Sequence, residues 1–329
     1  MKHGQVNLDD PATALALLNL KAVVGVTGFF DAGGNLKSMG IQCAFCHSTV
    51  DDSFAPGIGH RLDGWPNRDL SIVALAPDLS SVDNLLGVDD ATVRKVLNSW
   101  GPGKYDAQLF IDGKAYRPDG TSGATLIPPA YGLAGVNMGT STGYGSTTYW
   151  NAFVANLELH GKGTFYDARL NDPNQFPIAV KAGSWNVRND PDLITAKLAA
   201  LHFYQLAIPA PHAIDADNAF NFPAQRGKLI FNGKAKCAAC HVPPLFTEPG
   251  YNMHSVAEMG IDDFQAKRSP AGLYRTAPLA GLFSRQKGGF FHDGRFATLN
   301  DVVNHYDSFR GLGLSDDEKM DLVAYLKTL

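Results

Sequence analysis

This chain of 329 residues lacks several features that would point to other functions. It has no run of lysine and arginine, and its formal net charge of −4 leaves no basic surface for a phosphate backbone, which argues against a nucleic-acid partner. No apolar stretch reaches the about 20 uninterrupted residues of a membrane span. The most apolar early stretch, residues 12–30, is interrupted by Asn19 and Lys21, so we expect a core helix there.

Cysteine is equally scarce, and two matching motifs use all four residues of this type. The motifs comprise Cys43, Cys46 and His47 in CAFCH, and Cys237, Cys240 and His241 in CAACH. C-x-x-C-H is the attachment pattern of a c-type haem, because two thiols one helical turn apart reach its two vinyl groups and the next imidazole turns to the iron. The sequence therefore predicts two c-type haems, with the two histidines as proximal iron ligands.

Other uses of the paired cysteines fit less well. A four-cysteine zinc site would have to join halves about 190 residues apart and would leave both histidines unexplained. A thioredoxin-like redox pair would account for one motif but not for two. A disulfide across a two-residue gap would close a strained ring.

Thioether attachment of haem also bears on localisation. It implies an oxidising compartment outside the cytoplasm, for which we expect the bacterial periplasm. Residues 1–11 show no apolar segment or cleavage site of a secretory signal, so we expect that a signal peptide has been removed.

Helix signals surround the second motif. Leu229, Ile230 and Phe231 close a short amphipathic helix that Gly233 ends. Ser315 is a helix N-cap, and the apolar residues after it predict the closing helix of a small cytochrome c domain.

A helix end followed by a segment rich in helix-breaking residues predicts two domains. Residues 192–208 have the pattern of an amphipathic helix, and a segment rich in Pro and Asp follows them. Residues 101–148 are rich in Gly, Ser, Thr and Pro, which indicates a long functional loop. We therefore expect a mainly α protein with long irregular loops and two cytochrome c-like domains, residues 1–208 and 209–329, each with one haem.

Two haem motifs, GIGH after the first and FFHDGRFATL after the second, resemble the bacterial di-haem cytochrome c peroxidase and MauG family from about residue 40 to the end. The resemblance implies that the haem of residues 1–208 is the peroxide-type haem and that the haem of residues 209–329 is the electron-transfer haem. It also implies that His60, in GIGH, is the distal ligand of the peroxide-type haem and leaves the iron when the other haem is reduced. The alternative is a loop histidine that only forms hydrogen bonds in an Asp-rich stretch.

The resemblance also implies a glutamate over the peroxide haem. YWNAFVANLE aligns Glu158 with it, although Asn151, Ala152 and Phe153 replace the family's Asp, Gly and Arg. A carboxylate with a reference pKa of about 4.3 is ionised at pH 7 and can move a proton between the two peroxide oxygens. Glu158 could instead be a surface carboxylate, and His160 is a neighbouring candidate for the same proton transfer.

The sixth ligand of the second haem is methionine in the peroxidases and tyrosine in MauG. Counting along TLNDVVNHYD brings Tyr306 to that position. A tyrosine ligand must lose a proton of pKa about 10, and its anionic phenolate then favours oxidised iron. His305, Met253, Met259 and Met320 are rival ligands, although Met320 lies in the closing helix, where a core position is expected.

Other residues match family features near the haems. His292, Asp293 and Arg295 could orient a ligand or steady a haem propionate, or could form a buried turn. Tyr131 and Trp150 are candidates for an aromatic side chain between the haems. A calcium ion between the domains is also usual in the family, without clearly matching ligands here.

The resemblance implies a periplasmic enzyme that reduces hydrogen peroxide to water with electrons relayed through the second haem. The partners would be hydrogen peroxide and a small electron-donor protein such as a cytochrome or cupredoxin, and a homodimer is one option for the assembly. Two alternatives stay open: a MauG-like high-valent di-haem oxidase of a protein or organic substrate, and a simple di-haem electron-transfer cytochrome.

Overall fold

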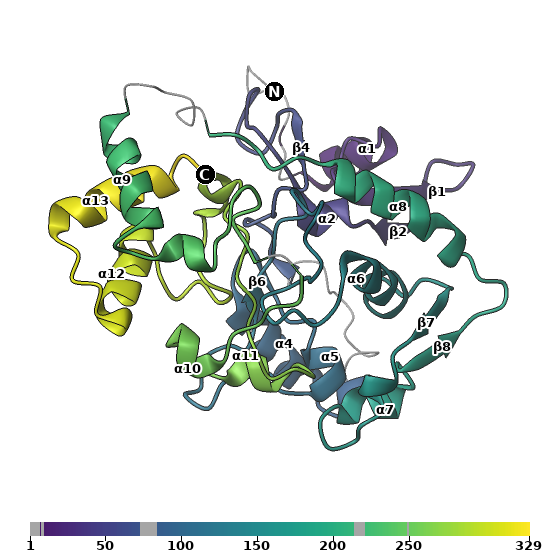
Figure 1. The fold of residues 1–329 in the computed structure, drawn as a ribbon. Coiled ribbons are helices and arrows are strands. Elements are labelled where there is room, and N and C mark those ends of the chain that lie inside the picture. Colours follow the sequence, from purple (N-terminus) through teal and green to yellow (C-terminus); the bar gives the residue numbers. More distant parts are fainter. Residues whose placement is uncertain (1–6, 8–9, 73–83, 214–220, 249) are drawn as a thin grey trace.

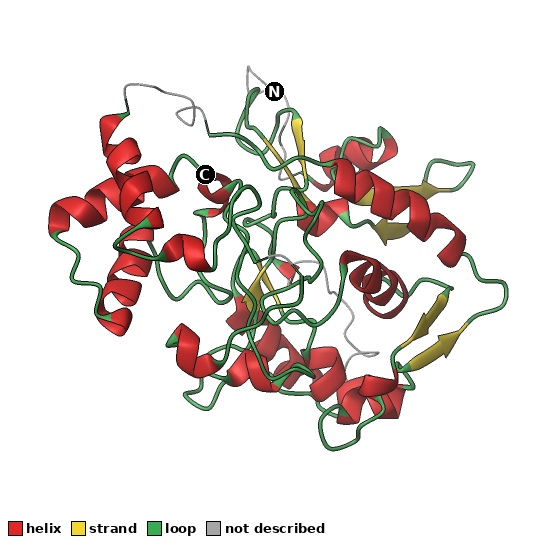
Figure 2. Ribbon diagram, in the orientation of Figure 1, coloured by secondary structure: helices red, strands yellow, loops and turns green. Residues whose placement is uncertain are grey.

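The computed structural model describes residues 7, 10–72, 84–213, 221–248 and 250–329. The chain is mainly helical, with short strands in two-stranded antiparallel sheets (Figures 1 and 2), as expected from the sequence. We call residues 10–213 the N-terminal half and residues 221–329 the C-terminal half. The predicted boundary segment lies partly outside the described residues, at 214–220, and so does most of residues 1–11. The division into two domains stays a prediction.

The chain begins with a short helix and a hairpin, α1 (Pro11–Asn19), β1 (Val26–Phe30) and β2 (Leu36–Ile41). The expectation of a core helix over residues 12–30 is therefore wrong, since α1 ends early and has no buried residue. The chain turns at Gly25, which has φ +76° and lies so close to Phe45 that a Cβ would fall 2.2 Å from its backbone N. Only glycine fits this turn, and the β-branched Val26 and Thr27 after it favour a strand.

The rest of the N-terminal half alternates short helices and strands. Its elements are α2 (Ala44–His47), β3 (Ser48–Val50), β4 (Arg61–Asp63), α4 (Asp90–Trp100), β5 (Lys104–Tyr105), α5 (Leu109–Asp112), β6 (Thr125–Leu126), α6 (Thr147–Phe153), β7 (Thr164–Tyr166), α7 (Pro177–Ala182), β8 (Asn186–Arg188) and α8 (Thr195–Ala207). The sheets pair β1 with β2, β3 with β4, β5 with β6, and β7 with β8.

Two predicted segments differ in burial from what their patterns suggested. Residues 101–148 are largely irregular, but Ile111, Tyr131 and Tyr144 within them are buried, so this segment builds the interior. The predicted amphipathic helix exists as α8, yet Gln205 is its buried residue and accepts a hydrogen bond from Asn151 (2.5 Å). A polar contact thus holds α8 against α6, where the apolar pattern predicted a hydrophobic face.

The C-terminal half comprises α9 (Phe222–Asn232), α10 (Val256–Met259), α11 (Phe264–Lys267), α12 (Leu299–Arg310) and α13 (Asp316–Leu326). The helix predicted before Gly233 is α9, and the closing helix is α13. Ser315 caps α13 as predicted, and the Glu318 side chain accepts in return from the Ser315 backbone N–H. This reciprocal capping box satisfies two backbone donors at the start of the helix.

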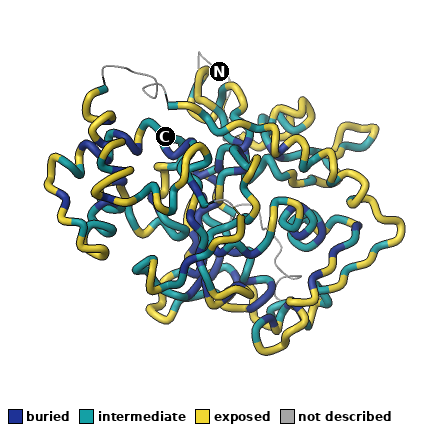
Figure 3. Tube along the Cα trace, viewed as in Figure 1, coloured by how far each residue is buried: buried dark blue, intermediate teal, exposed yellow. Residues whose placement is uncertain are grey.

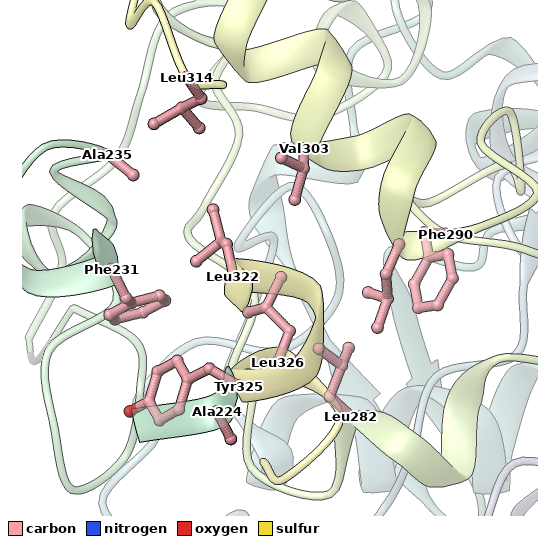
Figure 4. Packing of buried hydrophobic residues seen from close by; sticks show 11 residues of the cluster. Ala224, Phe231, Ala235, Leu282, Phe290, Val303, Leu314, Leu322, Tyr325 and Leu326 are labelled. Carbon is pink, nitrogen blue, oxygen red and sulfur yellow. The ribbon is translucent and has the colours of Figure 1, made fainter. Parts of the chain in front are cut away.

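Helices α9, α12 and α13 enclose the core of the C-terminal half (Figures 1 and 4). Phe231 of α9 meets Tyr325 of α13 edge to face, with ring centroids 5.3 Å apart, and Leu322 and Leu326 pack beside them. All members of this hydrophobic cluster come from residues 224–329, whereas the two other clusters come from residues 72–187. The two halves thus keep separate hydrophobic cores.

Polar contacts join the halves, and Figure 3 shows buried residues both at this junction and within each half. Arg268, only 1% exposed, follows α11 and forms ion pairs with Asp112 (2.7 Å) and Asp106 (3.1 Å) of the N-terminal half. Removing one partner from such a buried pair leaves an uncompensated charge, which is strongly destabilising. These contacts therefore fix how the two halves sit against each other.

Gly227 sets the close approach of α9 to α13. A Cβ at this position would lie 1.9 Å from the backbone O of Asp321. We expect Gly227→Ala to lower the free energy of unfolding by about 1–3 kcal/mol, despite the better helix propensity of alanine, because the helices must separate. Leu229→Ala on the same helix is the control, since Leu229 is 74% exposed and should change stability by about 0.5 kcal/mol or less. Urea unfolding measures both, and equal effects would contradict the prediction.

Candidate functional site

His47 of the first motif is held by the backbone. It ends α2, and its Nδ1 lies 3.0 Å from the carbonyl O of Pro128. Because a carbonyl can only accept, Nδ1 carries the hydrogen, and the neutral ring keeps a lone pair on Nε2. Burial lowers the pKa of His47, which favours this neutral form, while the hydrogen bond to Pro128 opposes the shift. A histidine in this state is prepared to ligate a metal through Nε2.

His241 of the second motif repeats the arrangement with an unrelated partner. Its Nδ1 lies 3.0 Å from the carbonyl O of Phe246, and burial likewise lowers its pKa. The acceptor is five residues away in the chain here, but 81 residues away for the first motif. Two different local folds thus produce the same histidine state.

The cysteines fit covalent attachment. Cys43, Cys46, Cys237 and Cys240 are all free thiols and partly buried. Burial raises the pKa of Cys46 to about 12, so this thiol is neutral at pH 7. Two neutral thiols beside one imidazole with a free Nε2 are the protein groups that a c-type haem requires, and each motif provides them.

Glu158 lies near enough to the first motif for its negative charge to raise the pKa of Cys46. α6 begins at the N-cap Ser146 and continues into a wider, π-helical turn, Val154–Glu158, and such turns are frequent at functional sites. Glu158 Oε1 is buried and has no hydrogen-bond partner among the described residues. The surface alternative for this residue is therefore wrong.

The environment of Glu158 keeps it protonated. Burial raises the pKa of its carboxyl to about 8, a hydrogen bond from Tyr105 acts in the opposite direction, and the negative charge of Asp106 raises the pKa further. The expectation of an ionised carboxylate at pH 7 is therefore wrong, because water that would stabilise the charge is excluded. His160, the neighbouring candidate, is exposed.

His60 lies at the opposite end of the β3–β4 hairpin from His47, because β3 follows His47 and β4 follows His60. Its Nδ1 bonds Ser53 Oγ (3.0 Å) and Asp51 Oδ2 (3.2 Å). The side chain is 70% exposed, and the structure records no bond to its Nε2 from a described residue. His60 is thus anchored through one ring nitrogen on a surface loop.

Tyr306 of α12 lies close to the second motif. Burial raises the pKa of its hydroxyl to about 12, Arg310 acts in the opposite direction, and the Cys237 and Cys240 thiols add smaller increases. The neighbouring His305 points elsewhere, since its Nε2 lies 3.2 Å from the carbonyl O of Met259.

The methionine rivals lie in different surroundings. Met320 is 61% exposed, so the expectation that it fills the core is wrong. The reason is its position on the outer side of α13, opposite Leu322 and Leu326. Met253 packs on Gly143 of the N-terminal half, next to Met138.

The two candidates for an aromatic side chain between the haems lie in different parts of the structure. Tyr131 is buried where the halves meet, and its hydroxyl donates to the Gly281 carbonyl (2.8 Å) and bonds Ser284 Oγ (2.6 Å). Trp150 instead packs within the N-terminal half, against Tyr149 and Phe153. Tyr131 is therefore the candidate that spans the junction.

The FFHDGR segment forms an ionic network. Arg295 pairs with Asp293 and Asp262, and Arg117 of the N-terminal half pairs with the same two carboxylates at 2.8 and 3.2 Å. Each carboxylate thus has two guanidinium partners, which offset its charge. His292 stacks on Tyr274 and its buried Nε2 is unpaired within the described structure. The calcium ion stays a prediction.

Some functional neighbours carried no sequence signal. Tyr105 and Asp106, which tune Glu158, occur in GPGKYDAQ, a segment that resembles an ordinary turn. The carbonyls of Pro128 and Phe246 belong to the backbone, which any residue supplies. Only the folded chain brings these groups together.

Fold and site together define a mainly helical chain with two sites that each fit a c-type haem.

Compared with known proteins, this chain is 31% identical over 157 residues to the methylamine utilization protein MauG of Methylorubrum extorquens. The match covers 41% of this chain and 43% of that protein. It is 28% identical over 157 residues to the cytochrome-c peroxidase IdrP1 of Denitromonas iodatirespirans, covering 34% and 41%. The cytochrome-c peroxidase IdrP1 of a Pseudomonas species is 26% identical over 303 residues, covering 68% and 79%.

The chain is therefore a distant homologue of MauG and of cytochrome c peroxidases. It spans less than half of the length of the first two relatives, 43% and 41%. No family model matches it.

Among solved structures, a MauG-like protein associated with microbial copper homeostasis matches at a TM-score of 0.41 and 20% identity, covering 68% of this chain and 79% of that one. Hydrazine synthase of Kuenenia stuttgartiensis matches at 0.38 and 18%, covering 71% and 92%. Scores this low bear on neither mechanism nor substrate. Within the described residues, no helix has the length and apolar character to cross a membrane.

The buried Glu158 predicts a specific pH dependence of stability. Between about pH 4.5 and pH 8 the unfolded chain has lost this proton and the folded chain keeps it, so the free energy of unfolding falls as pH rises. One proton corresponds to about 1.4 kcal/mol per pH unit. We expect Glu158→Gln to remove this contribution and to gain stability relative to the wild type as pH rises from 5 to 8.

Urea unfolding at several pH values measures the difference. Asp317→Asn, which removes an exposed carboxylate from α13, is the control and should run parallel to the wild type. Parallel curves for Glu158→Gln as well would show that this carboxyl is not held neutral.

Proposed function

We propose that this protein is a periplasmic di-haem c-type oxidoreductase that reduces hydrogen peroxide to water, with electrons relayed through the second haem. The observation that carries the proposal is a protonated, buried carboxyl, Glu158, beside one of two motifs whose histidines are both held with a free Nε2. The homology to cytochrome c peroxidases supports it.

The chain's own groups have separate tasks in this reaction. Cys43 and Cys46, and Cys237 and Cys240, would hold the haems, which supply the redox chemistry when bound. His47 and His241 would be the proximal ligands, each oriented by its carbonyl partner. A carbonyl acceptor fixes the ring plane and makes the imidazole a better donor to a metal.

Glu158 would handle protons. Reduction of hydrogen peroxide consumes two protons and two electrons and yields two waters. With a pKa of about 8, the carboxyl carries a proton at pH 7 and can give it to the departing oxygen, and the buried site favours its return to the neutral form. Tyr105 lies near enough to the carboxyl to lower its pKa and would help to position it.

His60 would be a displaceable ligand of the first haem. Its side chain is 70% exposed and is held through Nδ1 alone by Ser53 and Asp51, whereas the imidazoles of His47 and His241 lie in buried surroundings. A ring held through one nitrogen would be a more easily displaced ligand than the buried imidazoles of His47 and His241. Domains at residues 1–208 and 209–329 are also part of the proposal, supported by the separate hydrophobic clusters.

Tyr306 favours a second candidate function. A phenolate on the second haem suits oxidised iron, which would adapt the chain to oxidising a protein or organic substrate, as its homology to MauG also suggests.

In the main proposal, a peroxidase, the second haem would take electrons from a small cytochrome or cupredoxin. The calcium ion and a homodimer remain parts of the proposal that rest on the family resemblance alone.

Peroxide turnover by the haem-loaded protein tests the main proposal. We expect the half-reduced protein to consume hydrogen peroxide and to show a five-coordinate, high-spin first haem. Glu158→Gln should lower kcat/KM for peroxide by about 10²–10⁴-fold while the haem content stays at two per chain. Two low-spin haems in every redox state, with no peroxide consumption, would contradict both enzyme functions and leave the electron-transfer alternative.

Visible and EPR spectra test the second haem. Tyr306→Phe should change the visible spectrum of that haem, including its low-energy charge-transfer bands. The reason is that the substitution removes the oxygen ligand. Met320→Leu is the matched control and should change nothing, since Met320 is exposed on α13. An unchanged spectrum in Tyr306→Phe would exclude the tyrosine ligand.

A further inference from the structure

Three arginines near the junction of the halves, one buried and two partly buried, differ from the ion-paired arginines there. Arg268 has two carboxylate partners, Asp106 and Asp112, and Arg117 has Asp262 and Asp293. The exceptions are Arg68, Arg275 and Arg285, for which the described residues supply no carboxylate at ion-pair distance.

The partners of these three guanidiniums are neutral. Arg68, which is 9% exposed, donates from Nη1 to the Lys287 carbonyl (3.2 Å). Arg285 donates from Nη2 to the Pro278 carbonyl (2.6 Å), and Arg275 donates from Nε to the Thr140 carbonyl (2.6 Å). The Nε atoms of Arg68 and Arg285 are buried and have no hydrogen-bond partner within the described chain.

The group lies between the two motifs. Arg68 follows Asn67, whose backbone N donates to the Cys46 carbonyl (2.8 Å) of the first motif. Arg285 is near enough to His241 of the second motif for its charge to lower the pKa of that histidine. Tyr131, which spans the junction, interacts with both Arg68 and Arg285. Arg68 thus lies next to the first site and Arg285 next to the second, and Arg275 lies near enough to Arg285 to feel its charge.

Keeping these cations together is costly. Burial lowers the pKa of Arg68 to about 10 and that of Arg275 to about 10, and in both cases the positive charge of Arg285 adds to the effect. Burial also lowers the pKa of Arg285. A buried cation that is surrounded by like charges and offers unused N–H donors is stable only when an anion compensates it.

We propose that Arg68, Arg275 and Arg285 form a carboxylate-binding site that holds propionate groups of the two haems. The inference rests on the haems of the proposed function and goes beyond it, because it assigns their side-chain recognition to these three residues. A guanidinium presents paired N–H donors in a plane that matches a carboxylate, and the orphaned Nε atoms are donors of this kind. Each haem has two propionates, so several carboxylates can meet the three cations between the sites.

Redox titration of the haem-loaded protein tests the site. Arg68→Gln and Arg285→Gln each remove a positive charge near a propionate, so we expect the midpoint potential of at least one haem to shift to more negative values in each variant. Without its guanidinium a propionate titrates closer to neutral pH, so the variant should also gain an extra dependence of potential on pH between about pH 5 and 8. Arg68→Lys and Arg285→Lys should restore most of the shift, because they keep the charge.

Two controls make the outcome unambiguous. Arg94→Gln on α4 removes an arginine whose side chain is 39% exposed and pairs with Asp90, and it should leave both potentials unchanged. Haem content of two per chain shows that each variant has folded and matured. Unchanged potentials and unchanged pH dependence in both glutamine variants, with two haems present, would overturn this inference and leave the proposed function intact. A wild-type protein that takes up no haem would instead overturn the proposed function.

A free anion is the competing occupant. Inorganic phosphate added to the wild type at constant ionic strength should leave both potentials unchanged if propionates fill the site. A phosphate-dependent shift in the wild type that disappears in Arg285→Gln would show that the arginines bind a free anion, and would overturn the assignment to propionate.

Discussion

The hydrogen bond from a motif histidine to a backbone carbonyl is the constraint on which the rest of this site depends. It sets the tautomer of His47 and His241 and leaves Nε2 of each ring as a donor to a metal. Burial acts in the same direction, because a charged imidazole would be poorly solvated there. Without these two bonds, neither imidazole would be fixed in the tautomer whose Nε2 can bind a metal.

The interior of each half is apolar, whereas the junction between the halves is polar. Each half has its own hydrophobic core, and the junction between them is built from ion pairs and hydrogen bonds. Low-dielectric surroundings make each of these interactions stronger and each unpaired group more costly. The same junction places Glu158 near Asp106, and Asp106 pairs with Arg268 of the other half. Protonation at the first site is thereby linked electrostatically to a residue beyond the junction.

Sequence patterns predicted the parts of this structure that local chemistry determines. The two motifs, the helix before Gly233 and the capping of the closing helix by Ser315 were all visible in short stretches of residues. The ionisation of Glu158 was not, because it follows from burial by segments far apart in the chain. The exposure of Met320 and the polar face of α8 also depend on which neighbours cover each helix, and periodicity alone does not supply this information.

The π-helical turn at Val154–Glu158 amounts to one extra residue inserted into the course of a helix. In a regular helix each residue rotates the next by about 100°, so a chain without this insertion would present a different side chain to the first motif. Distant homologues that lack the extra residue would place their carboxyl on another side of the helix. A sequence alignment without a gap at this turn would then pair residues that lie on different sides of the helix.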